Sequence, residues 1–310
     1  MAHNLTNLVQ TKIIPGLYNM YVQGATTSWM ENNSVGVEYR GGKYVYMTEM
    51  EVEGLANYDR ALGYVRGNVT GSKKQYEMTM DRGRDFLIDY ADYDETGYLL
   101  SVANVMATFQ REHVIPEIDC YRYSKIYSII NTENPGNISD EAIDAKKITE
   151  MLADDISDLQ DQFGMDVPLR IIMSGKTQKY LGREWIHNLN YGEMKVGNVN
   201  LKIKSLDGNP FDIVPSARLK SAYTFNDGVT GGQEAGGFKA KSDAKDIKWI
   251  ITPASAPVAV MKIDKSRTFS PDEYPDAHAW KTDYRVFHDL WMLPKGVAYT
   301  KIRTGAITEV

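Results

Sequence analysis

The sequence has one cysteine, Cys120, and no long apolar run. A single thiol cannot build an internal disulfide framework, so the composition excludes a disulfide-stapled secreted domain. No apolar stretch reaches the roughly 20 residues that a transmembrane helix needs. The opening residues "MAHNLTNLVQ" lack the basic and apolar regions of a secretory signal. These absences predict an intracellular product without a membrane segment.

Positive charge is in the minority, with 35 lysines and arginines against 41 aspartates and glutamates and a formal net charge of -6. Sequence-independent affinity for nucleic acid comes mostly from lysines and arginines that neutralise phosphates. The charge balance therefore argues against a chain that binds DNA or RNA by bulk attraction. Local contact with DNA stays open.

Signals for a metal, a cofactor or a thiol enzyme are also lacking. The five histidines form no i, i+4 pair and no H-E-x-x-H motif, so no zinc site is predicted. Cys120 has no nearby histidine and no Gly-rich nucleophile turn. "SGKTQKY" (174–180) contains the end of a phosphate loop, but Arg170 stands where the first glycine is needed. We predict no catalytic residue, no metal ligand and no cofactor.

Tyrosine and methionine, by contrast, are plentiful, with 20 and 14 copies. Both are enriched at protein interfaces, where amphipathic or adaptable side chains pack without a charge cost. A tyrosine-rich core explains the same composition equally well. With 43% hydrophobic residues, the chain can bury a sizeable core in either case.

Two strand-like runs follow an N-terminal stretch, residues 1 to 35, that has no sustained period and predicts an extended arm. "KYVYMTEMEV" and "KQYEMTMD" alternate apolar and polar side chains with the period of half-buried strands. The glycine-rich "GLANYDRALGYVRGNVTG" lies between them. This pattern predicts a long two-stranded excursion, which needs another surface because a lone two-stranded ribbon is marginal in water.

A long helix is predicted next. Apolar residues from Leu99 to Phe109 recur every three or four positions, and Asp94 is placed to cap the first turn. Pro116 would kink or break the helix, yet the pattern resumes as far as Ile130. If continuous, the element has roughly 35 residues and spans about 50 Å. Such a length indicates the backbone of an elongated molecule.

The rest of the chain mixes helix and strand signals. "NTENPGN" is typical of a linker, and Ser139 is placed to cap a second amphipathic helix that Gly164 closes. "PLRIIMS" predicts a buried strand, and the glycine-rich stretch 226–246 predicts a surface loop. Strand signals return at "APVAVMKID" and "KGVAYTKI". Because no βαβ rhythm is visible, the predicted class is α+β.

"DRGRDFLIDYADYDETG" (81–97) gathers six carboxylates and two arginines. A calcium loop that starts at Asp92 would need a glutamate at its twelfth position, which is Ala103. A metal-dependent phosphoryl-transfer site on Asp92 and Asp94 would need the first aspartate directly after an apolar strand, but three residues separate it from "FLI". The surviving interpretation is electrostatic: these charges pair with one another or across a subunit boundary.

Three long blocks carry a resemblance: "GLANYDRALGYVRGNVT", then "DRGRDFLIDYADYDETGYLLSVANVMATFQREHVIPEIDCYRYSKI", and "RTFSPDEYPDAHAWKTDYRVFHDLWML" near the end. On these blocks, in this order and at these separations, the sequence resembles the major capsid proteins of tailed bacteriophages. That shell fold is shared with encapsulins and the floor of the herpesvirus capsid. The blocks span the chain, and none of them is a catalytic signature.

The resemblance implies an α+β fold in four parts, in agreement with the segments drawn from the residues. These are an N-terminal arm (1–35), an extended two-stranded loop (36–84), a peripheral domain with a long spine helix (85–132 and 258–310) and an axial domain (133–257). Some members of the family begin with a scaffolding segment, whereas this sequence starts at the arm. The sequence would therefore be that of a mature form, or the chain would use a separate scaffolding protein.

The implied function is structural and not enzymatic. The chain would assemble as hexamers and pentamers into an icosahedral phage head around double-stranded DNA, without sequence-specific DNA binding. It would be made in the bacterial cytoplasm, end in the virion, and meet a scaffold, a portal and decoration proteins. One alternative is an encapsulin-type compartment that encloses cargo enzymes; the other is the phosphoryl-transfer enzyme on Asp92 and Asp94.

Five charged residues are our candidates for contacts between subunits. Asp59 and Arg60 lie near the far end of the predicted ribbon, and Arg82, Arg84 and Asp89 lie at its base. The competing interpretation is that all five are ordinary solvated charges, which make up much of any protein surface.

Overall fold

A computed structural model of the chain describes residues 24–34, 38–39, 42–61, 63–90, 102–189, 205–206 and 208–308. Most of the predicted arm and the carboxylates Asp92 and Asp94 lie outside the described residues. The predictions of an extended arm, of a helix cap at Asp94 and of a metal or phosphoryl-transfer site at 92–97 therefore stay predictions.

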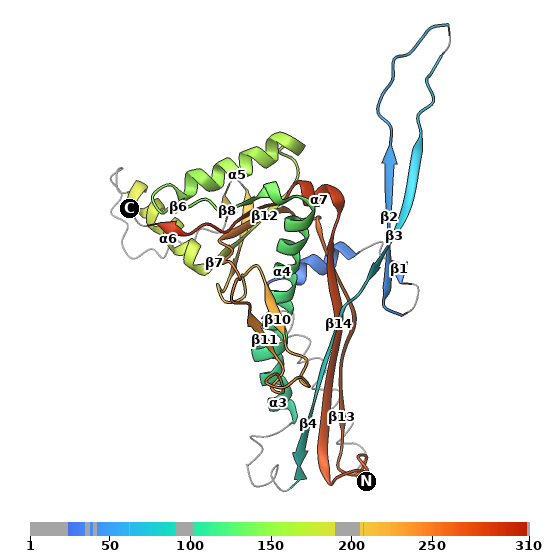
Figure 1. Cartoon of the computed structure of the whole chain (residues 1–310), viewed down its shortest axis with the longest axis vertical. Coiled ribbons are helices and arrows are strands. Elements are labelled where there is room, and N and C mark those ends of the chain that lie inside the picture. The colour runs from blue at the N-terminus through green and yellow to red at the C-terminus, as the bar shows by residue number, and fades with distance from the viewer. Residues whose placement is uncertain are drawn as a thin grey trace.

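A long, narrow antiparallel sheet runs along one side of the molecule (Figure 1). Its order is β13-β14-β4, with β14 in the middle and paired along almost its whole length on both sides. Most of β14 is buried, whereas β4 is mostly exposed or partly buried, with Ile88 as its one buried residue. The strands are β4 (Met80–Asp89), β13 (Pro257–Phe269) and β14 (Ala279–Met292).

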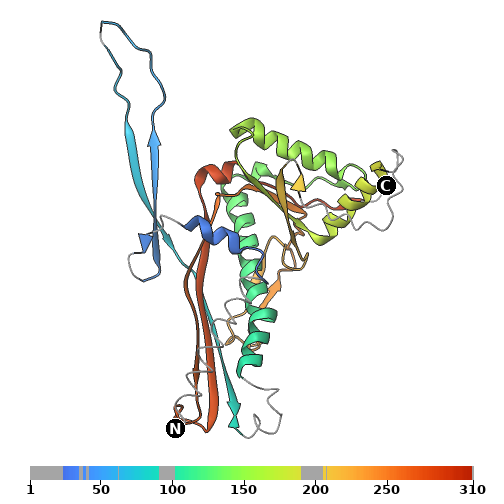
Figure 2. The same ribbon diagram turned by 180° about the vertical axis from the view of Figure 1, so that it is seen from behind.

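The predicted spine helix lies against this sheet (Figures 1 and 2). It consists of α3 (Val102–Phe109), a π-helical turn (Gln110–Val114) and α4 (Ile115–Glu133). Pro116 does not break it, because the wider π turn just before the proline absorbs the missing backbone donor and the clash of its ring. The sequence left open whether Pro116 breaks the helix. Over the described residues the helix is continuous, and we call this element, 102–133, the spine helix.

A second layered unit lies beside the upper end of the spine helix (Figure 1). Its mixed six-stranded sheet has the order β5-β15-β12-β7-β9-β8, in which β7 and β9 are parallel and α6 connects them along the chain. Buried apolar residues of α5 and of the central strands form one core cluster. The elements are β5 (Ile138–Ser139), α5 (Ile148–Phe163), β7 (Leu169–Ser174), α6 (Gly175–Leu189), β8 (Ser205–Leu206), β9 (Asn209–Val214), β12 (Trp249–Pro253) and β15 (Lys301–Arg303).

Small elements complete the body. A short hairpin lies next to the spine helix, a parallel pair joins the C-terminal strand to the segment before α5, and a short helix follows β14. They are β10 (Tyr223–Phe225), β11 (Phe238–Ala240), β6 (Ile143–Asp144), β16 (Ile307–Thr308) and α7 (Pro294–Ala298). Helices and strands mix without a repeated βαβ pattern, so the α+β prediction is confirmed. The division into four domains stays a prediction.

A two-stranded ribbon projects from the body (Figures 1 and 2). β2 (Tyr44–Val52) and β3 (Val69–Glu77) pair in antiparallel register along their full length, and the short β1 (Glu38–Tyr39) pairs with the base of β2. We call residues 44–77 the ribbon and residues 54–61 with 63–67 its tip. The predicted two-stranded excursion is therefore present.

Three local predictions are wrong. Ser139 does not cap a helix: it ends β5, and α5 begins only at Ile148, although it ends before Gly164 as predicted. "KQYEMTMD" is not one strand, because Met78 and Thr79 separate β3 from β4. "KGVAYTKI" is helical at its start, since Pro294 occupies the first turn of α7, where a proline costs no hydrogen bond.

Candidate assembly surface

The ribbon exposes most of the large apolar side chains on the molecular surface. Among the described residues, 13 large apolar side chains are exposed, and eight of them lie in the ribbon. Large apolar side chains that are exposed together on one element are typical of a surface that another molecule covers. The eight residues are Tyr44, Met50, Val52, Leu55, Tyr58, Tyr64, Val65 and Val69.

The ribbon tip has its own local structure. Asp59 and Gly63 exchange backbone hydrogen bonds of 3.3 and 2.7 Å, and the Asp59 carboxylate accepts the Ala61 amide at 2.6 Å. Gly63 has φ of 80°, a left-handed conformation that favours glycine. The rings of Tyr58 and Tyr64 are in contact, with centroids 4.9 Å apart and planes tilted by 57°. The tip is therefore a shaped knob with two outward tyrosines.

The end of the ribbon carries charged side chains of both signs. The Asp59 carboxylate accepts a backbone hydrogen bond within the turn of the tip, and the Glu53 carboxylate accepts one from the Asn68 amide at 2.9 Å. Arg60 and Arg66 are exposed to solvent. The end of the ribbon therefore carries exposed charges of both signs, the carboxylates Glu53 and Asp59 and the two arginines.

At its base the ribbon is clamped by apolar contacts. Val45, Met47 and Met78 belong to one buried cluster with side chains of β13 and β14, and the ring of Tyr76 lies 5.5 Å from that of Trp291. Met47 is 7% exposed, whereas Met50, three residues further along β2 and on the opposite face of the strand, is 71% exposed. The base is part of the body, whereas the outer ribbon has no cover.

A buried carboxylate fixes the break between β3 and β4. Asp289 of β14 has no exposed surface. It accepts the Thr79 amide at 2.8 Å, the Thr79 hydroxyl at 3.0 Å and the Tyr121 hydroxyl of α4 at 2.6 Å. Because a buried carboxylate needs such partners, these bonds hold the start of the ribbon, the sheet and the spine helix together.

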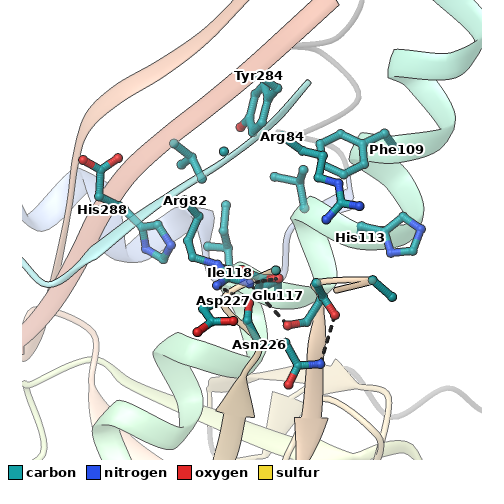
Figure 3. A pocket seen from close by; sticks show the side chains of 18 of the residues that line it. Arg82, Arg84, Phe109, His113, Glu117, Ile118, Asn226, Asp227, Tyr284 and His288 are labelled. Atoms are coloured by element: carbon teal, nitrogen blue, oxygen red, sulfur yellow. Dashed lines mark hydrogen bonds and ion pairs between the residues drawn. The ribbon is translucent and has the colours of Figure 1, made fainter. Parts of the chain in front are cut away.

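A cleft of about 370 Å³ opens between β4, the spine helix and the loop 226–237, which we call the glycine loop. Figure 3 shows its lining side chains. Its floor is aromatic, with the rings of Phe86 and Phe109 edge to face at 4.9 Å and that of Tyr284 at 6.1 Å from Phe109. Polar side chains from the three elements surround this floor.

Two arginines of β4 hold the glycine loop over the cleft (Figure 3). Arg82 donates to Glu117 of α4 at 2.7 Å and to the carbonyl oxygens of Asn226 and Gly237 at 2.6 and 3.3 Å. Arg84 donates to the Glu234 carbonyl at 3.3 Å, and its guanidinium is otherwise exposed at the mouth. The Arg82 guanidinium thus donates its hydrogen bonds to groups of the same chain, whereas most N–H donors of the Arg84 guanidinium stay accessible.

The rim of the cleft on the glycine loop is acidic. The Thr230 hydroxyl and the amides of Thr230 and Val229 bind the Asp227 carboxylate and lower its pKa to about 2. The Glu234 pKa is also lowered, by its own amide and that of Gly232. Both side chains are exposed and remain ionised at neutral pH.

His288 lies at the inner end of the cleft with its Nδ1 buried and without a hydrogen-bond partner among the described residues. Burial, with the positive charges of Arg122 and Arg82, lowers the pKa of His288 to about 3. The imidazole is therefore neutral at physiological pH and adds no charge to the site.

No protein-family model matches the sequence, and no curated protein matches it. Several solved structures, by contrast, are similar to this chain. The capsid structure of cyanophage P-SCSP1u has a TM-score of 0.58 and 10% identity, covering 87% of this chain and 85% of that one. The mature capsid of bacteriophage PhiM1 gives 0.56 and 11%, covering 85% and 82%. The procapsid of satellite phage P4, which includes a size determination protein, gives 0.52 and 11%, covering 92% of both chains.

The chain has the phage major capsid protein fold. At these identities the likeness concerns the fold alone, and it extends over most of the chain. The resemblance inferred from the three sequence blocks is confirmed at this level.

Within this capsid fold, the charged strip of β4 pairs largely with its own sheet. Asp81 accepts two hydrogen bonds from Arg285 of β14, at 2.8 and 2.5 Å, and Asp85 lies 3.6 Å from Lys281. Asp89 is exposed at the end of β4. These partners are neither members of the strip nor residues of another subunit, so the pairing seen here was not predicted, and pairing across a subunit boundary stays a prediction.

The five candidate contact residues fall in two places. Asp59 and Arg60 are exposed on the ribbon tip, and Arg82 and Arg84 line the cleft. Asp89 belongs to neither, since it lies at the far end of β4. The structure brings the two arginines together but leaves the tip residues far from them (Figure 1). Their role in subunit contacts stays a prediction.

Sequence reasoning missed the buried charges that anchor the segment 24–34. Asp119 accepts the Thr26 and Thr27 hydroxyls, both at 2.8 Å, and Arg122 donates to Glu31 at 2.7 Å. Both side chains are on α4 and fully buried. A signal existed: in a helix with a buried face, charged residues at positions three apart on that face require partners from another segment.

No group of three or more metal-ligating side chains occurs within the described ranges. In the same part of the chain, none of the helices is long and apolar enough to span a membrane.

Proposed function

We propose that the chain is the subunit of an icosahedral phage head. It assembles as hexamers and pentamers into a shell around double-stranded DNA and has no enzymatic activity. One observation carries this proposal: the ribbon exposes eight large apolar side chains that its own body cannot cover. In a chain with a capsid fold, the natural cover is the next subunit.

The physics of the ribbon favours repeated contacts. An element on one face of a subunit that binds a different face of the next gives a heterologous contact, and such contacts close into rings when the rotation permits. The described part of the ribbon offers apolar area for such a contact, and specific interfaces bury about 800 Å² on each partner. In a closed shell, this apolar surface is covered on every copy of the chain.

Further partners follow from the same proposal. The P4 procapsid includes a size determination protein, which supports a scaffold or size-setting partner for this chain as well. A portal and decoration proteins would complete the head. With a net charge of -6, the shell would enclose DNA without sequence-specific binding, and the chain would be found in the virion after assembly in the bacterial cytoplasm.

Removing the ribbon tip tests the proposal. The Glu53 amide donates to the Asn68 carbonyl at 3.2 Å, so replacing residues 54–67 by Asn-Gly closes the hairpin with a two-residue turn. We expect this variant to unfold at the wild-type temperature but to form no closed particles by electron microscopy and light scattering. Met165→Ser, which removes a comparably exposed side chain outside the ribbon, should assemble normally.

Two results would contradict the proposal. One is a wild-type chain that stays monomeric under assembly conditions with every scaffolding protein tested. The other is the formation of normal particles by the variant with the truncated ribbon. The contents of particles from the native source distinguish a phage head, which holds long DNA, from an encapsulin-type compartment, which holds protein.

A further inference from the structure

We propose that the cleft between β4, the spine helix and the glycine loop binds a free aromatic amino acid. The ring of the ligand lies on the aromatic floor, its carboxylate binds Arg84 and its ammonium group binds Asp227. The observations that carry this inference are the floor itself, a neutral interior and two opposite charges in the lining that do not pair with each other. The inference goes beyond the proposed shell function and does not depend on it, since every residue it uses belongs to one chain.

The floor of the cleft offers a packing site for an aromatic ring. Phe86 of β4, Phe109 of the spine helix and Tyr284 of β14 all line it, with ring centroids 4.9 and 6.1 Å from that of Phe109. A further ring can pack edge to face or offset against such a cluster. The volume of about 370 Å³ is near the lower end of the range of binding pockets, roughly 300 to 1,000 Å³. It therefore favours a ligand of the size of one amino acid.

The interior of the cleft carries no uncompensated charge. Arg82 and Glu117 form an ion pair at 2.7 Å, Asp81 is bound by Arg285, and His288 is neutral at physiological pH. A charged group of a ligand would lose its hydration in this interior without gaining a partner. The ring of the ligand therefore points inward, and its charged end stays at the mouth.

Two charged side chains of opposite sign remain in the lining, and they come from different elements (Figure 3). Arg84 of β4 donates to the Glu234 carbonyl at 3.3 Å and is otherwise exposed. Asp227 of the glycine loop is exposed and ionised, because its bonds from Val229 and Thr230 lower its pKa to about 2. No ion pair joins Arg84 to Asp227 in the part of the chain that the structure describes. Each of the two can therefore bind a group of the ligand.

An α-amino acid matches this pair of charges. Its carboxylate accepts the N–H donors of a guanidinium, and its ammonium group donates to a carboxylate. Both are charge-assisted hydrogen bonds, which are stronger than neutral ones. A ligand with an anionic group alone meets the repulsion of Asp227, and a ligand with a cationic group alone meets that of Arg84. The cleft thus selects a molecule that carries both charges next to a ring.

Two glycines of the loop leave room for the guanidinium at the mouth. A Cβ atom at Gly236 would lie 3.0 Å from Arg84 Nη1, and one at Gly228 would lie 3.6 Å from it. The φ angles of Gly236 and Gly228, 68° and 77°, are in the left-handed region that favours glycine. A larger residue at Gly236 would displace the arginine that receives the carboxylate.

A ligand-observed NMR titration of the purified full chain with L-phenylalanine tests the site. We expect saturable binding with a dissociation constant on the order of 1 mM, since a small ligand gains little free energy per atom. Three analogues are the controls: phenylpropionate lacks the ammonium group, phenethylamine lacks the carboxylate and L-alanine lacks the ring. Each should bind about tenfold more weakly, because each loses one of the three contacts.

Two variants make the test specific for the two charges. R84Q should weaken the binding of L-phenylalanine about tenfold but should not weaken that of phenethylamine, which has no carboxylate. D227N should likewise weaken the binding of L-phenylalanine about tenfold but not that of phenylpropionate, which has no ammonium group. R267Q removes an exposed arginine of β13 that does not line the cleft, and it should change none of these affinities.

Three results would overturn the proposal. One is the absence of saturable L-phenylalanine binding up to concentrations on the order of 10 mM. Another is an equal response of R84Q, D227N and R267Q. The third is binding of N-acetyl-phenylalaninamide, in which both charges are blocked, as tightly as that of L-phenylalanine, because the cleft would then take the aromatic side chain of a protein. None of these results bears on the shell function, which particle formation tests.

Discussion

The ribbon and the long sheet of the body are built from the same kind of strand but have opposite surroundings. β2 and β3 pair over nine residues, and β13 and β14 pair over a longer length. The spine helix covers the sheet, so that most of β14 is buried. Nothing in the described residues covers the outer ribbon, and its apolar side chains are exposed.

This difference shows that alternation alone does not decide what a strand buries. A period of two places apolar side chains on one face, and the next layer of structure determines whether that face becomes core or interface. For the sheet, this next layer is the spine helix of the same chain. No described residue provides such a layer for the outer ribbon, so the two regions should respond differently to mutation.

Asp289→Asn should produce the largest effect, because it breaks the connection between the two regions. One carboxylate oxygen accepts the Thr79 amide and the other accepts the Leu290 amide at 2.7 Å. An asparagine has only one acceptor oxygen, so one of these two backbone N–H groups would face the NH2 group without an acceptor. We expect a loss of about 3 kcal/mol in the free energy of unfolding. Denaturant unfolding followed by tryptophan fluorescence measures this loss.

Asp155→Asn is the matched control for this change. Asp155 is a buried carboxylate bound to Trp249 and Arg303 in the other unit, so its loss should be of similar size. Only Asp289→Asn should speed hydrogen exchange of the amides at the ribbon base. If both variants affect the ribbon equally, Asp289 does not hold the ribbon in place.

Two methionines on one strand provide a sharper comparison. Met47 is buried at the ribbon base and Met50 is exposed three residues further along. Met47→Ala should cost about 2 to 3 kcal/mol in unfolding free energy, since it leaves a cavity in the clamp. Met50→Ala should change the stability of the subunit by less than about 0.5 kcal/mol but should weaken assembly. Equal stability losses would mean that the outer ribbon packs against its own body.

Much of this architecture could be predicted from the sequence. The ribbon, the spine helix, the helix that ends at Gly164 and the buried strand "PLRIIMS" all have strong local signals: a clear period, a breaker or a cap. The α+β class and the capsid fold followed from the order of these segments and from the three blocks.

The wrong predictions depend on tertiary contacts. The strand "KQYEMTMD" has an unbroken period of two, and only the carboxylate of Asp289, 210 residues away in sequence, breaks it at Thr79. Ser139 has the pattern of a helix cap, but its segment pairs with β15 from the end of the chain. Local propensity is a weak prior when such distant partners compete.

The candidate contact residues show the same limit. The sequence indicated charged residues at the tip and at the base of the ribbon, but nothing in "DRGRD" distinguishes the role of Arg82 from that of Arg84. The fold separates them: Arg82 ties three elements together within the chain, and Arg84 stays at the mouth of the cleft. The cleft itself could not be predicted, since its walls come from segments that lie more than a hundred residues apart.

Asp81→Asn should give the smallest effect, because it removes an ion pair on the exposed face of the sheet. Asp81 and Arg285 form a two-pronged pair with both side chains partly exposed. Pairs of this kind contribute at most about 1 kcal/mol and are screened by salt. The difference in unfolding free energy between wild type and variant should therefore be small at low salt and smaller still in concentrated salt.

The pH dependence of that difference has a definite sign. The hydrogen bonds from Arg285 hold the pKa of Asp81 below its ordinary value of 3.8, so the unfolded chain takes up the proton first as the pH falls. The contribution of the pair is present above pH 3.8 and disappears as the pH drops through the lower value in the folded chain. Unfolding measured in parallel for wild type and Asp81→Asn should show two curves that differ at neutral pH and converge in acid. Curves that stay apart in acid would mean that Asp81 stabilises the sheet by packing, as a buried residue does, and the contrast between exposed and buried pairing would not hold for this strand.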